Sequence, residues 1–259
     1  MTDETASVSE DAVLGGRLVL RQPLKGHRVG HDAILLAAAC SVRPGGRLVD
    51  LGAGVGAAGL AVAKRVAALD VTLVEIDPAL TALAHGNAAR NGLADRVRSV
   101  CLDAMEPASS FDAADLRSGG ADHVLMNPPF NTADHVSPDP GRRLAHVAGQ
   151  DSLTAWTSAA ARLLRPGGTL TLIWRADGLD AVLAALRTTG FGAVTALPVH
   201  PKPRAAAIRV LVRAVKASNA PFSLLPGLIL ADAAGRQSAE VEAVLRGGEI
   251  LPLAEIGAV

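Results

Sequence analysis

The sequence predicts an α/β fold: one mostly parallel sheet of seven strands, helices on both faces, and an antiparallel edge. First, short apolar runs alternate with longer helix-like segments from residue 47 onward, as in parallel sheets buried on both faces. Second, Arg-Pro-Gly-Gly occurs at 43–46 and at 165–168, each time directly before an apolar run, which is a helix-stop and strand-start signal. Third, only a short segment separates the β runs 193–197 and 206–215, so these two should pair antiparallel.

Local signals predict each element in turn. Strands are expected where short runs are rich in Val, Leu and Ile, at 17–20, 48–51, 71–76, 97–102, 123–126, 169–174, 193–197 and 206–215. Helices are expected at 33–40, 57–68, 78–91, 152–164 and 179–188. Asp32 fits the cap of the first helix, and Pro78 the first turn of the third. After residue 217 the periodicity is weaker, with a strand expected at 224–230 and a helix at 240–245.

Composition excludes several classes of protein. Apolar residues are 49% and charged residues 19% of the 259, which does not fit a disordered chain; only the acidic and polar segment 1–12 is expected to be a disordered tail. No apolar run approaches the roughly 20 residues that span a bilayer, and the chain has no secretory signal pattern. Cys40 and Cys101 lie in apolar sequence and are expected as free thiols. We therefore expect a cytoplasmic protein without a membrane partner.

A glycine-rich loop follows the first parallel strand. Gly52, Gly54 and Gly56 permit a tight turn and the close approach of a ligand to bare backbone. The loop should lie at the carboxyl ends of the strands, where open α/β sheets bind their ligands. Glu75 ends the next strand, so its carboxylate can accept hydrogen bonds from both hydroxyls of a ribose. These features predict a site for a ligand that contains a nucleoside.

Two carboxylates bear on the identity of that ligand. Gly54, Gly56 and Gly59 also match the dinucleotide pattern G-x-G-x-x-G, so the glycines alone do not exclude NAD. Asp50 precedes them, and an acid there suits the ammonium and sulfonium groups of S-adenosylmethionine (AdoMet), whereas it would repel a pyrophosphate. Asp103 ends the third parallel strand, where it could meet an adenine amino group or cap a turn. We expect AdoMet as the cofactor and no metal.

The strongest signal is Asn-Pro-Pro-Phe at 127–130, after the fourth parallel strand. An exocyclic or amide nitrogen is a poor nucleophile because its lone pair is delocalised. The Asn127 side-chain oxygen and the Pro128 carbonyl can accept its two hydrogens, and the two prolines fix the backbone so that both acceptors are pre-aimed. Phe130 can stack on a flat base. The motif therefore predicts an N-methyltransferase, with Asn127, Pro128 and Phe130 at the reaction centre.

A basic stretch runs from 181 to 231, where the chain has no Asp or Glu although its net charge is zero. Two interpretations remain open at this point. The stretch is an RNA-binding surface, or it is a sheet edge on which Lys and Arg prevent pairing with other chains. On the first interpretation, the RNA-binding residues are Lys202, Arg204, Arg209 and Arg213.

Six segments together resemble the bacterial tRNA1(Val) (adenine-37-N6)-methyltransferase family. The segment 22–36 is similar to that family's amino-terminal motif, and 200–204 to its carboxyl-terminal signature; between them, 50–56, 74–78, 87–93 and 127–130 follow at fitting intervals. The chain departs from the pattern at His31, where threonine is expected, and at Phe130, where tyrosine is more common. The resemblance implies a Rossmann-like class I methyltransferase fold and methyl transfer to N6 of an adenine in tRNA, near the anticodon.

The resemblance also implies an organisation and a set of ligand contacts. Residues 13–46 would form an extension over the cofactor site, 47–217 the methyltransferase core, and 218–259 an extension packed on the core. The residues that would hold AdoMet are Gly30, Asp32, Asp50, Gly52, Gly54, Gly56, Glu75, Asp103 and Asn127. We expect a monomer or a weak homodimer that binds RNA.

Three other functions remain as alternatives. The same chemistry could serve guanine N2 in rRNA or a protein glutamine, although such relatives are expected to carry an additional substrate domain before the glycine loop. A non-catalytic AdoMet-binding protein would not need Asp50, Glu75 and Asn127 together. An NAD oxidoreductase would have no use for the motif at 127–130.

Overall fold

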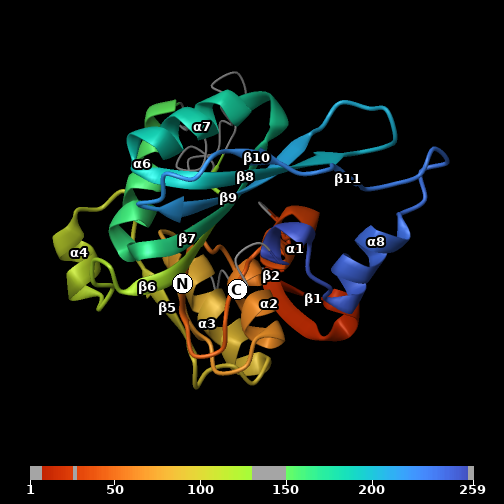
Figure 1. Ribbon diagram of the computed structural model, residues 1–259. Coiled ribbons are helices and arrows are strands. Elements are labelled where there is room, and N and C mark those ends of the chain that lie inside the picture. The colour runs from red at the N-terminus through yellow and green to blue at the C-terminus, as the bar shows by residue number, and fades with distance from the viewer. Residues whose placement is uncertain (1–7, 26–27, 130–149, 256–259) are drawn as a thin grey trace.

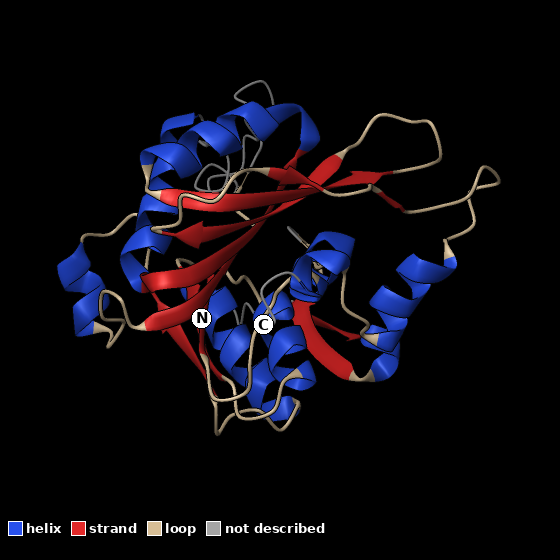
Figure 2. Cartoon of the chain, in the orientation of Figure 1, coloured by secondary structure: helices blue, strands red, loops and turns tan. Residues whose placement is uncertain are grey.

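The computed structural model describes residues 8–25, 28–129 and 150–255. They form a large mixed sheet with helices on both faces and a separate two-stranded hairpin (Figures 1 and 2). The long strands of this sheet are β3 (Arg47–Leu51), β4 (Asp70–Glu75), β5 (Val97–Cys101), β6 (Ala121–Met126), β7 (Leu164–Arg175), β8 (Phe191–His200) and β9 (Arg209–Lys216). The helices around it are α1 (His31–Ala38), α2 (Ala57–Arg65), α3 (Pro78–Arg90), α4 (Ala108–Ala113), α6 (Gln150–Leu163) and α7 (Leu179–Thr188).

The long strands lie in the order β8-β9-β7-β6-β3-β4-β5. Neighbours from β7 to β5 are parallel, whereas β9 is antiparallel to both β7 and β8. The prediction of a mostly parallel seven-stranded sheet with an antiparallel edge is therefore confirmed. Two strands of two residues each, β10 (Ser223–Leu224) and β11 (Leu228–Ile229), pair parallel with β8 and extend that edge.

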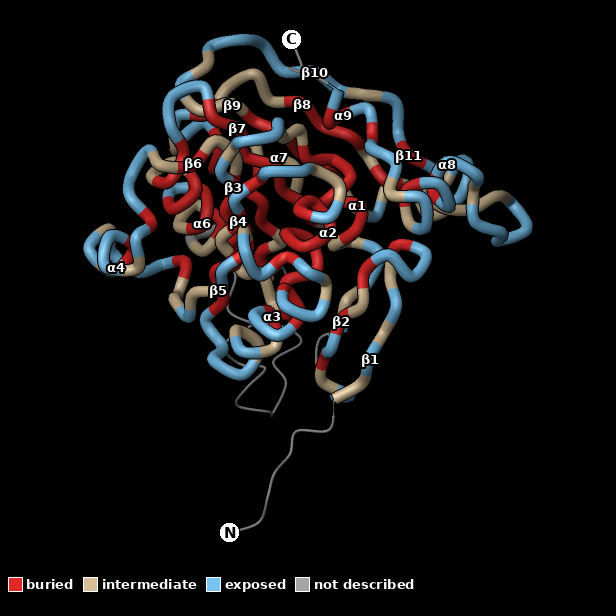
Figure 3. Tube along the Cα trace, turned by 90° about the horizontal axis from the view of Figure 1, so that it is seen from below, coloured by how far each residue is buried: buried red, intermediate tan, exposed pale blue. Residues whose placement is uncertain are grey.

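The sheet separates two hydrophobic cores because successive strand residues point to opposite faces. Leu48 and Leu73 pack with α1, α2 and α3, whereas Val49 and Val74 pack with α4, α6 and α7. The buried residues concentrate in the sheet and on the helix sides that face it (Figure 3). Burial on both faces explains why the central strands are almost continuously apolar.

Capping explains where α3 begins and ends. The Asp77 side chain accepts hydrogen bonds from the backbone N–H groups of Ala79 and Leu80, and Pro78 occupies the first turn. Gly92 follows the helix with a φ of +69°. By contrast, α4 at 108–113 has no counterpart in the predicted elements.

The amino-terminal segment corrects one prediction. Residues 8–12, expected in a disordered tail, belong to β1 (Val8–Val13), which pairs antiparallel with β2 (Leu18–Pro23). Leu18 and Leu20 of β2 are fully buried, and this apolar side anchors the hairpin. The acidic residues that suggested disorder instead make ion pairs on the outside, Asp11 with Arg28 and Glu10 with Arg90. Residues 1–7 lie outside the described part of the chain.

The carboxyl-terminal segment lies against α1 and the hairpin. It contains α8 (Ala239–Glu242), the turn η4 (Ala243–Gly247) and α9 (Pro252–Glu255). The Leu251 N–H donates to the carbonyl of Ala38 at 2.9 Å, and the Leu251 and Leu253 side chains are fully buried. Within the described ranges, no helix is long and apolar enough to cross a bilayer.

Candidate functional site

The sequence features singled out above lie along one edge of the sheet. β6, β3, β4 and β5 are adjacent and parallel, so the segments after their last residues emerge together at the carboxyl edge. These segments carry the glycine loop after β3, Glu75 at the end of β4, Asp103 after β5 and Asn127 after β6. Among the residues the structure describes, no group of three or more His, Cys, Asp or Glu side chains could hold a metal ion at this edge or elsewhere.

The glycine loop is packed on one side and open on the other. Gly52, Gly54 and Gly56 have φ values of +71°, +56° and +89°, a conformation that disfavours any residue with a Cβ. The Gly52 N–H donates to the Val74 carbonyl at 2.9 Å, which fastens the loop to β4. A Cβ at Gly52 would lie 2.6 Å from Cη2 of Trp156, whereas a Cβ at Gly54 would meet no described atom within 4 Å. Gly54 therefore lies where backbone is accessible to a ligand.

Asp50 lies beneath this loop rather than beside its open face. Its side chain is buried, and Oδ2 accepts a hydrogen bond of 2.8 Å from the Gly59 N–H in α2. Burial raises the pKa of Asp50 to about 7; the Gly59 hydrogen bond opposes this rise, and the Glu75 carboxylate adds to it. Asp50 thus ties the first turn of α2 to β3 and introduces a buried acid near the carboxyl edge.

Glu75 supports the loop from the neighbouring strand. Its Oε2 accepts a 2.8 Å hydrogen bond from the Gly54 N–H, and its Oε1 accepts one of 3.0 Å from the Asp77 N–H. Each carboxylate oxygen can accept a further hydrogen bond, so capacity for two hydroxyls remains. The sequence left two roles open for Asp103, a contact to adenine or a turn contact. In the structure Asp103 makes a turn contact, because it accepts a hydrogen bond from the Met105 N–H.

Two exposed apolar side chains accompany these carboxylates and were missed in the sequence. Ile76 directly follows Glu75 and is 45% exposed, and Met105 follows Asp103 by two residues and is 55% exposed. The signal that could have found them is their position immediately beyond acidic strand ends. Their apolar surfaces at this edge suit a flat, uncharged ring.

Asn127 provides the most informative observation at the site. Its Oδ1 is buried and accepts no hydrogen bond from any residue that the structure describes. A buried acceptor without a partner costs about 1–3 kcal/mol, and at the carboxyl edge of the sheet a bound ligand can supply the missing donor. Pro128 is buried beside it and Pro129 is half-buried. Phe130, predicted as a stacking surface, lies outside the described residues.

The beginning of α1 also reaches the carboxyl edge. Gly30 is the N-cap and His31 the first helical residue, so Asp32 is not the cap that the sequence suggested but lies in the first turn. Its Oδ2 accepts a 2.9 Å hydrogen bond from Nε of Arg209, the first residue of β9. Arg209 pairs with Arg175, the last residue of β7, so it lies at the carboxyl edge of the sheet. Its hydrogen bond to Asp32 therefore locates the start of α1 at this edge.

The four predicted RNA-binding residues divide into different environments. Lys202 and Arg204 are exposed in the β8–β9 loop, whereas Arg209 is engaged with Asp32. The prediction for Arg213 is wrong: this residue is only 7% exposed, and its Nε donates to Ser41 Oγ at 3.3 Å. Because β9 lies between β8 and β7, its central side chains are buried within the protein and do not face a bound RNA.

Asn87 positions the site although it lies outside it. This side chain is fully buried; Nδ2 donates to the carbonyls of Arg21 and Val55 at 3.0 Å each, and Oδ1 accepts from the Arg21 N–H at 2.7 Å. It thereby joins α3, β2 and the glycine loop. A polar residue on the buried side of a helix is the signal that could have identified this role.

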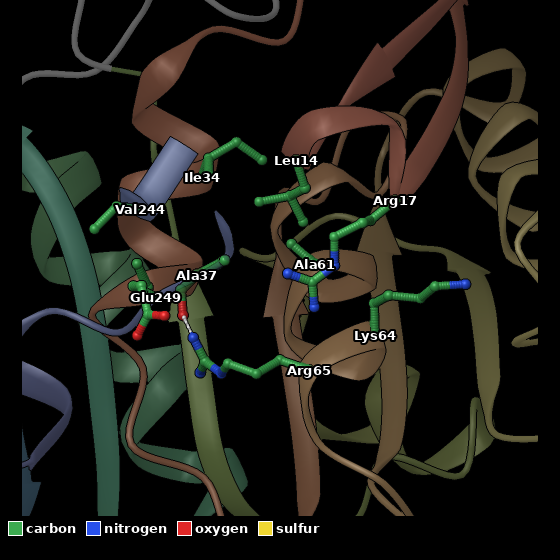
Figure 4. A pocket seen from close by; sticks show the side chains of 11 residues that line it. Leu14, Arg17, Ile34, Ala37, Ala61, Lys64, Arg65, Val244 and Glu249 are labelled. Carbon is green, nitrogen blue, oxygen red and sulfur yellow. Dashed lines mark hydrogen bonds between the residues drawn. The ribbon is translucent and has the colours of Figure 1, made fainter. Parts of the chain in front are cut away.

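A separate, small hollow lies between α1 and α2, away from the glycine loop (Figure 4). Its lining includes Leu14, Ile34, Ala61 and Val244, and Arg65 beside it donates to the Ala37 carbonyl. The glycine loop precedes the first residue of α2, whereas this hollow contacts the second half of that helix. It is therefore distinct from the carboxyl-edge site.

Solved structures share this fold. An Agrobacterium tumefaciens protein described as a predicted O-methyltransferase superposes with a TM-score of 0.70 at 28% identity, covering 85% of this chain and 98% of that one. The 16S rRNA N2 G1207 methyltransferase of T. thermophilus, solved with AdoMet and guanosine, gives a TM-score of 0.56 at 22% identity, covering 81% of this chain and 50% of that one. The class I methyltransferase fold predicted from the sequence is confirmed.

Curated relatives and a family model give the same assignment. A protein of Tolumonas auensis is 31% identical over 164 residues, covering 63% of this chain and 65% of its own length, and one of Bacteroides thetaiotaomicron is 30% identical over 190 residues, covering 71% and 75%. Both are named tRNA1(Val) (adenine(37)-N6)-methyltransferase. The model of the methyltransferase small domain matches residues 27–194. Because this match spans well over half of the chain, the protein belongs to the methyltransferase small domain family.

Proposed function

We propose that this protein transfers a methyl group from AdoMet to the N6 amino group of an adenine near the anticodon of a tRNA. The observation that carries the proposal is the buried and unpartnered Oδ1 of Asn127, followed by the carbonyl of Pro128. Asn127 Oδ1 and the Pro128 carbonyl together suit an amino group, which brings two hydrogens, whereas an oxygen nucleophile brings only one. The names of the relatives favour adenine 37 as the target.

The residues at the carboxyl edge fit AdoMet as the methyl donor. The open backbone at Gly54 admits the ligand, the free lone pairs of Glu75 suit its ribose, and Ile76 and Met105 offer apolar surface to its adenine. Gly52, Gly56, Asp50 and Asn87 shape the loop from below. Gly30 and Asp32, at the start of α1, lie at the same edge and would border the amino-acid end of the ligand.

The chain's own groups then account for the transfer. AdoMet supplies a methyl group on a positively charged sulfur. Asn127 Oδ1 and the Pro128 carbonyl accept the two amino hydrogens and hold the nitrogen lone pair toward that methyl group, and such preorganised acceptors need no rearrangement during the reaction. Once the methyl group had moved from sulfur to nitrogen, the nitrogen would carry a positive charge and be acidic. It would release one proton to solvent, so no dedicated base is required, while Asn127 Oδ1 would remain a hydrogen-bond acceptor.

Guanine N2 in rRNA is the second candidate. It presents the same two hydrogens to Asn127, and a structural neighbour of this chain is a guanine N2 methyltransferase. Adenine in tRNA is preferred because the relatives at about 30% identity carry that name. In either case the protein is expected to act in the cytoplasm as a monomer or weak homodimer.

The experiment is methyl transfer from AdoMet with a labelled methyl group to bulk tRNA from cells that lack the modification, followed by digestion to nucleosides. Label in N6-methyladenosine is the expected result. Ribosomal RNA and protein are offered in parallel as competing acceptors. Label in N2-methylguanosine, or in protein, with none in tRNA would contradict the proposal.

A further inference from the structure

A surface hollow lies between the β8–β9 loop and β11. Its lining combines two cationic side chains, an imidazole, an apolar side chain and a glycine: Lys202, Arg204, His200, Ile229 and Gly227, together with Ala205 and Ala206. In Figure 1 the β8–β9 loop extends well beyond the end of β7, with β11 running alongside β8. Lys202, Arg204 and Ala206 of its lining are exposed, so the hollow is open at the surface.

The loop that lines the hollow is held in one conformation. A carbonyl only accepts, so the His200 Nδ1–H donates to the Ala205 carbonyl at 2.8 Å; the Ala205 N–H in turn donates to the Lys202 carbonyl at 3.2 Å. Pro201 and Pro203 restrict the backbone further. Arg204 has a φ of +63°, an unfavourable value for a residue with a Cβ. Such strain persists where the surroundings impose it, and it is concentrated at binding sites.

The hollow opens at the edge that carries Asn127. β6 and β7 are parallel, and β9 is antiparallel to both β7 and β8, so β8 ends at the same edge of the sheet as β6. Lys202 and Arg204 follow His200, the last residue of β8, as Asn127 follows the last residue of β6, and Ile229 of β11 pairs with His200. A polymer held in the hollow can therefore extend along this edge to the site of methyl transfer.

The charges favour an anionic occupant. Lys202 and Arg204 are exposed, and in the described ranges neither forms a salt bridge with a carboxylate. Protection of a bare sheet edge does not explain them, because the edge of β8 is already paired with β10 and β11. A preorganised pair of cations beside an apolar floor fits the phosphates and sugars of a nucleic acid.

We propose that this hollow binds the sugar–phosphate backbone of the substrate RNA beside the target nucleotide, with Lys202 and Arg204 as the phosphate contacts and His200 as the positioning residue of the loop. This inference rests on the proposed function, since it names the surface that presents RNA to Asn127. Ile229 and the ring of His200 would contact the sugar. Arg209 and Arg213, which are engaged elsewhere, have no part in it.

The test compares the double variant Lys202→Ala/Arg204→Ala with Arg187→Ala, which removes an exposed cation of the same acid-free stretch on α7, away from the hollow. The dissociation constant for bulk tRNA is measured at several salt concentrations, together with AdoMet affinity and methyl transfer. We expect the double variant to bind tRNA at least tenfold more weakly, with a salt slope reduced by about 1–2. Its AdoMet affinity and maximal rate should match the wild type.

Two further variants separate charge from loop shape. Arg204→Lys keeps the cation, so its affinity for tRNA should stay much closer to the wild type than that of the double variant. His200→Ala should raise the KM for tRNA with little change in kcat. Equal tRNA affinity for the double variant and Arg187→Ala, with the wild type active on tRNA, would overturn the hollow as the RNA site and leave the proposed function standing. A wild type that neither binds nor methylates tRNA would overturn both.

Discussion

Asp50 shows how a single buried residue of β3 makes the stability of the protein depend on pH. Its ordinary pKa is 3.8, and burial raises this to about 7 in the folded chain. Between these values the folded protein holds a proton that the unfolded chain has released. Ionisation of Asp50 in the unfolded chain therefore progressively lowers the free energy of unfolding as pH rises from 4 to 7. His123 acts in the opposite direction in an overlapping range, since burial lowers its pKa to about 4.

Asp50→Asn isolates this contribution, because an amide oxygen can still accept the hydrogen bond of Gly59. The variant should match the wild type near pH 4 and become more stable than it as pH rises to 7, by at most about 4 kcal/mol at one pKa unit per 1.36 kcal/mol. Urea unfolding from pH 4.5 to 8 measures the difference. A difference that does not change with pH would show that Asp50 is not a buried, titrating acid.

Gly54 and Gly16 form a matched pair for testing the open face of the loop. Both have positive φ, +56° and +88°, and a Cβ at either would meet no described atom within 4 Å. Each Ala substitution should therefore cost about 1 kcal/mol of stability from backbone strain. Only Gly54→Ala should also weaken AdoMet binding, by tenfold or more in calorimetry, because its methyl group occupies the ligand's space. Equal AdoMet affinity for both variants would be inconsistent with a ligand at Gly54.

Residue types at strand ends were predictable from the sequence, whereas the partners of long basic side chains were not. Glu75 was found because it ends a parallel strand beside the glycine loop, and Asn127 because it begins the Asn-Pro-Pro-Phe motif. Arg213 looked like part of a basic surface, but the sequence does not tell which face of β9 lies under the end of α1. Asp32 was assigned to the cofactor, and its described partner is Arg209, which is 177 residues away in the chain.

At the scale of elements, the connection between α3 and the amino-terminal hairpin shapes the site. Asn87→Ala removes three hydrogen bonds and leaves the Arg21 N–H and the Val55 carbonyl without this partner. We expect a loss of about 2–4 kcal/mol in the free energy of unfolding and weaker AdoMet binding. Asn219→Ala, at an exposed position, is the control. Unchanged stability in Asn87→Ala would refute this role.

The elements themselves were predicted with uneven success for identifiable reasons. β3, β4, β6, β7 and β9 were recognised because burial on both faces makes long parts of them apolar. β5 and β8 are only partly buried and were recognised from shorter apolar runs. β1 was missed because its burial alternates weakly and its polar residues resemble a disordered tail. The helix expected at 57–68 ends at Arg65, since Val66 is extended and Ala68 has a φ of +54°. The end of α2 depends on how the chain turns into β4, which begins at Asp70, and no strong local sequence signal marks it.

At the scale of the whole molecule, the terminal segments share one core with the sheet. Leu18 and Leu20 of the hairpin, Val241 and Leu251 of the carboxyl-terminal segment, and Leu73 of β4 belong to a single buried cluster. We therefore expect one cooperative unfolding transition, monitored together by far-ultraviolet circular dichroism and by tryptophan fluorescence. Two separated transitions would mean that the extensions fold independently of the methyltransferase core.

The most direct test of the account is single-turnover methyl transfer to tRNA by wild type and Asn127→Ala, with AdoMet affinity measured on the same preparations. Because Oδ1 of Asn127 has no described partner in the free protein, the variant should keep its stability and bind AdoMet within a few-fold of the wild type. Its rate of transfer should fall by 100-fold or more, as for the loss of a preorganised polar group at a reaction centre. A variant that binds AdoMet and methylates tRNA at the wild-type rate would contradict the assignment of Asn127 as the group that orients the nitrogen.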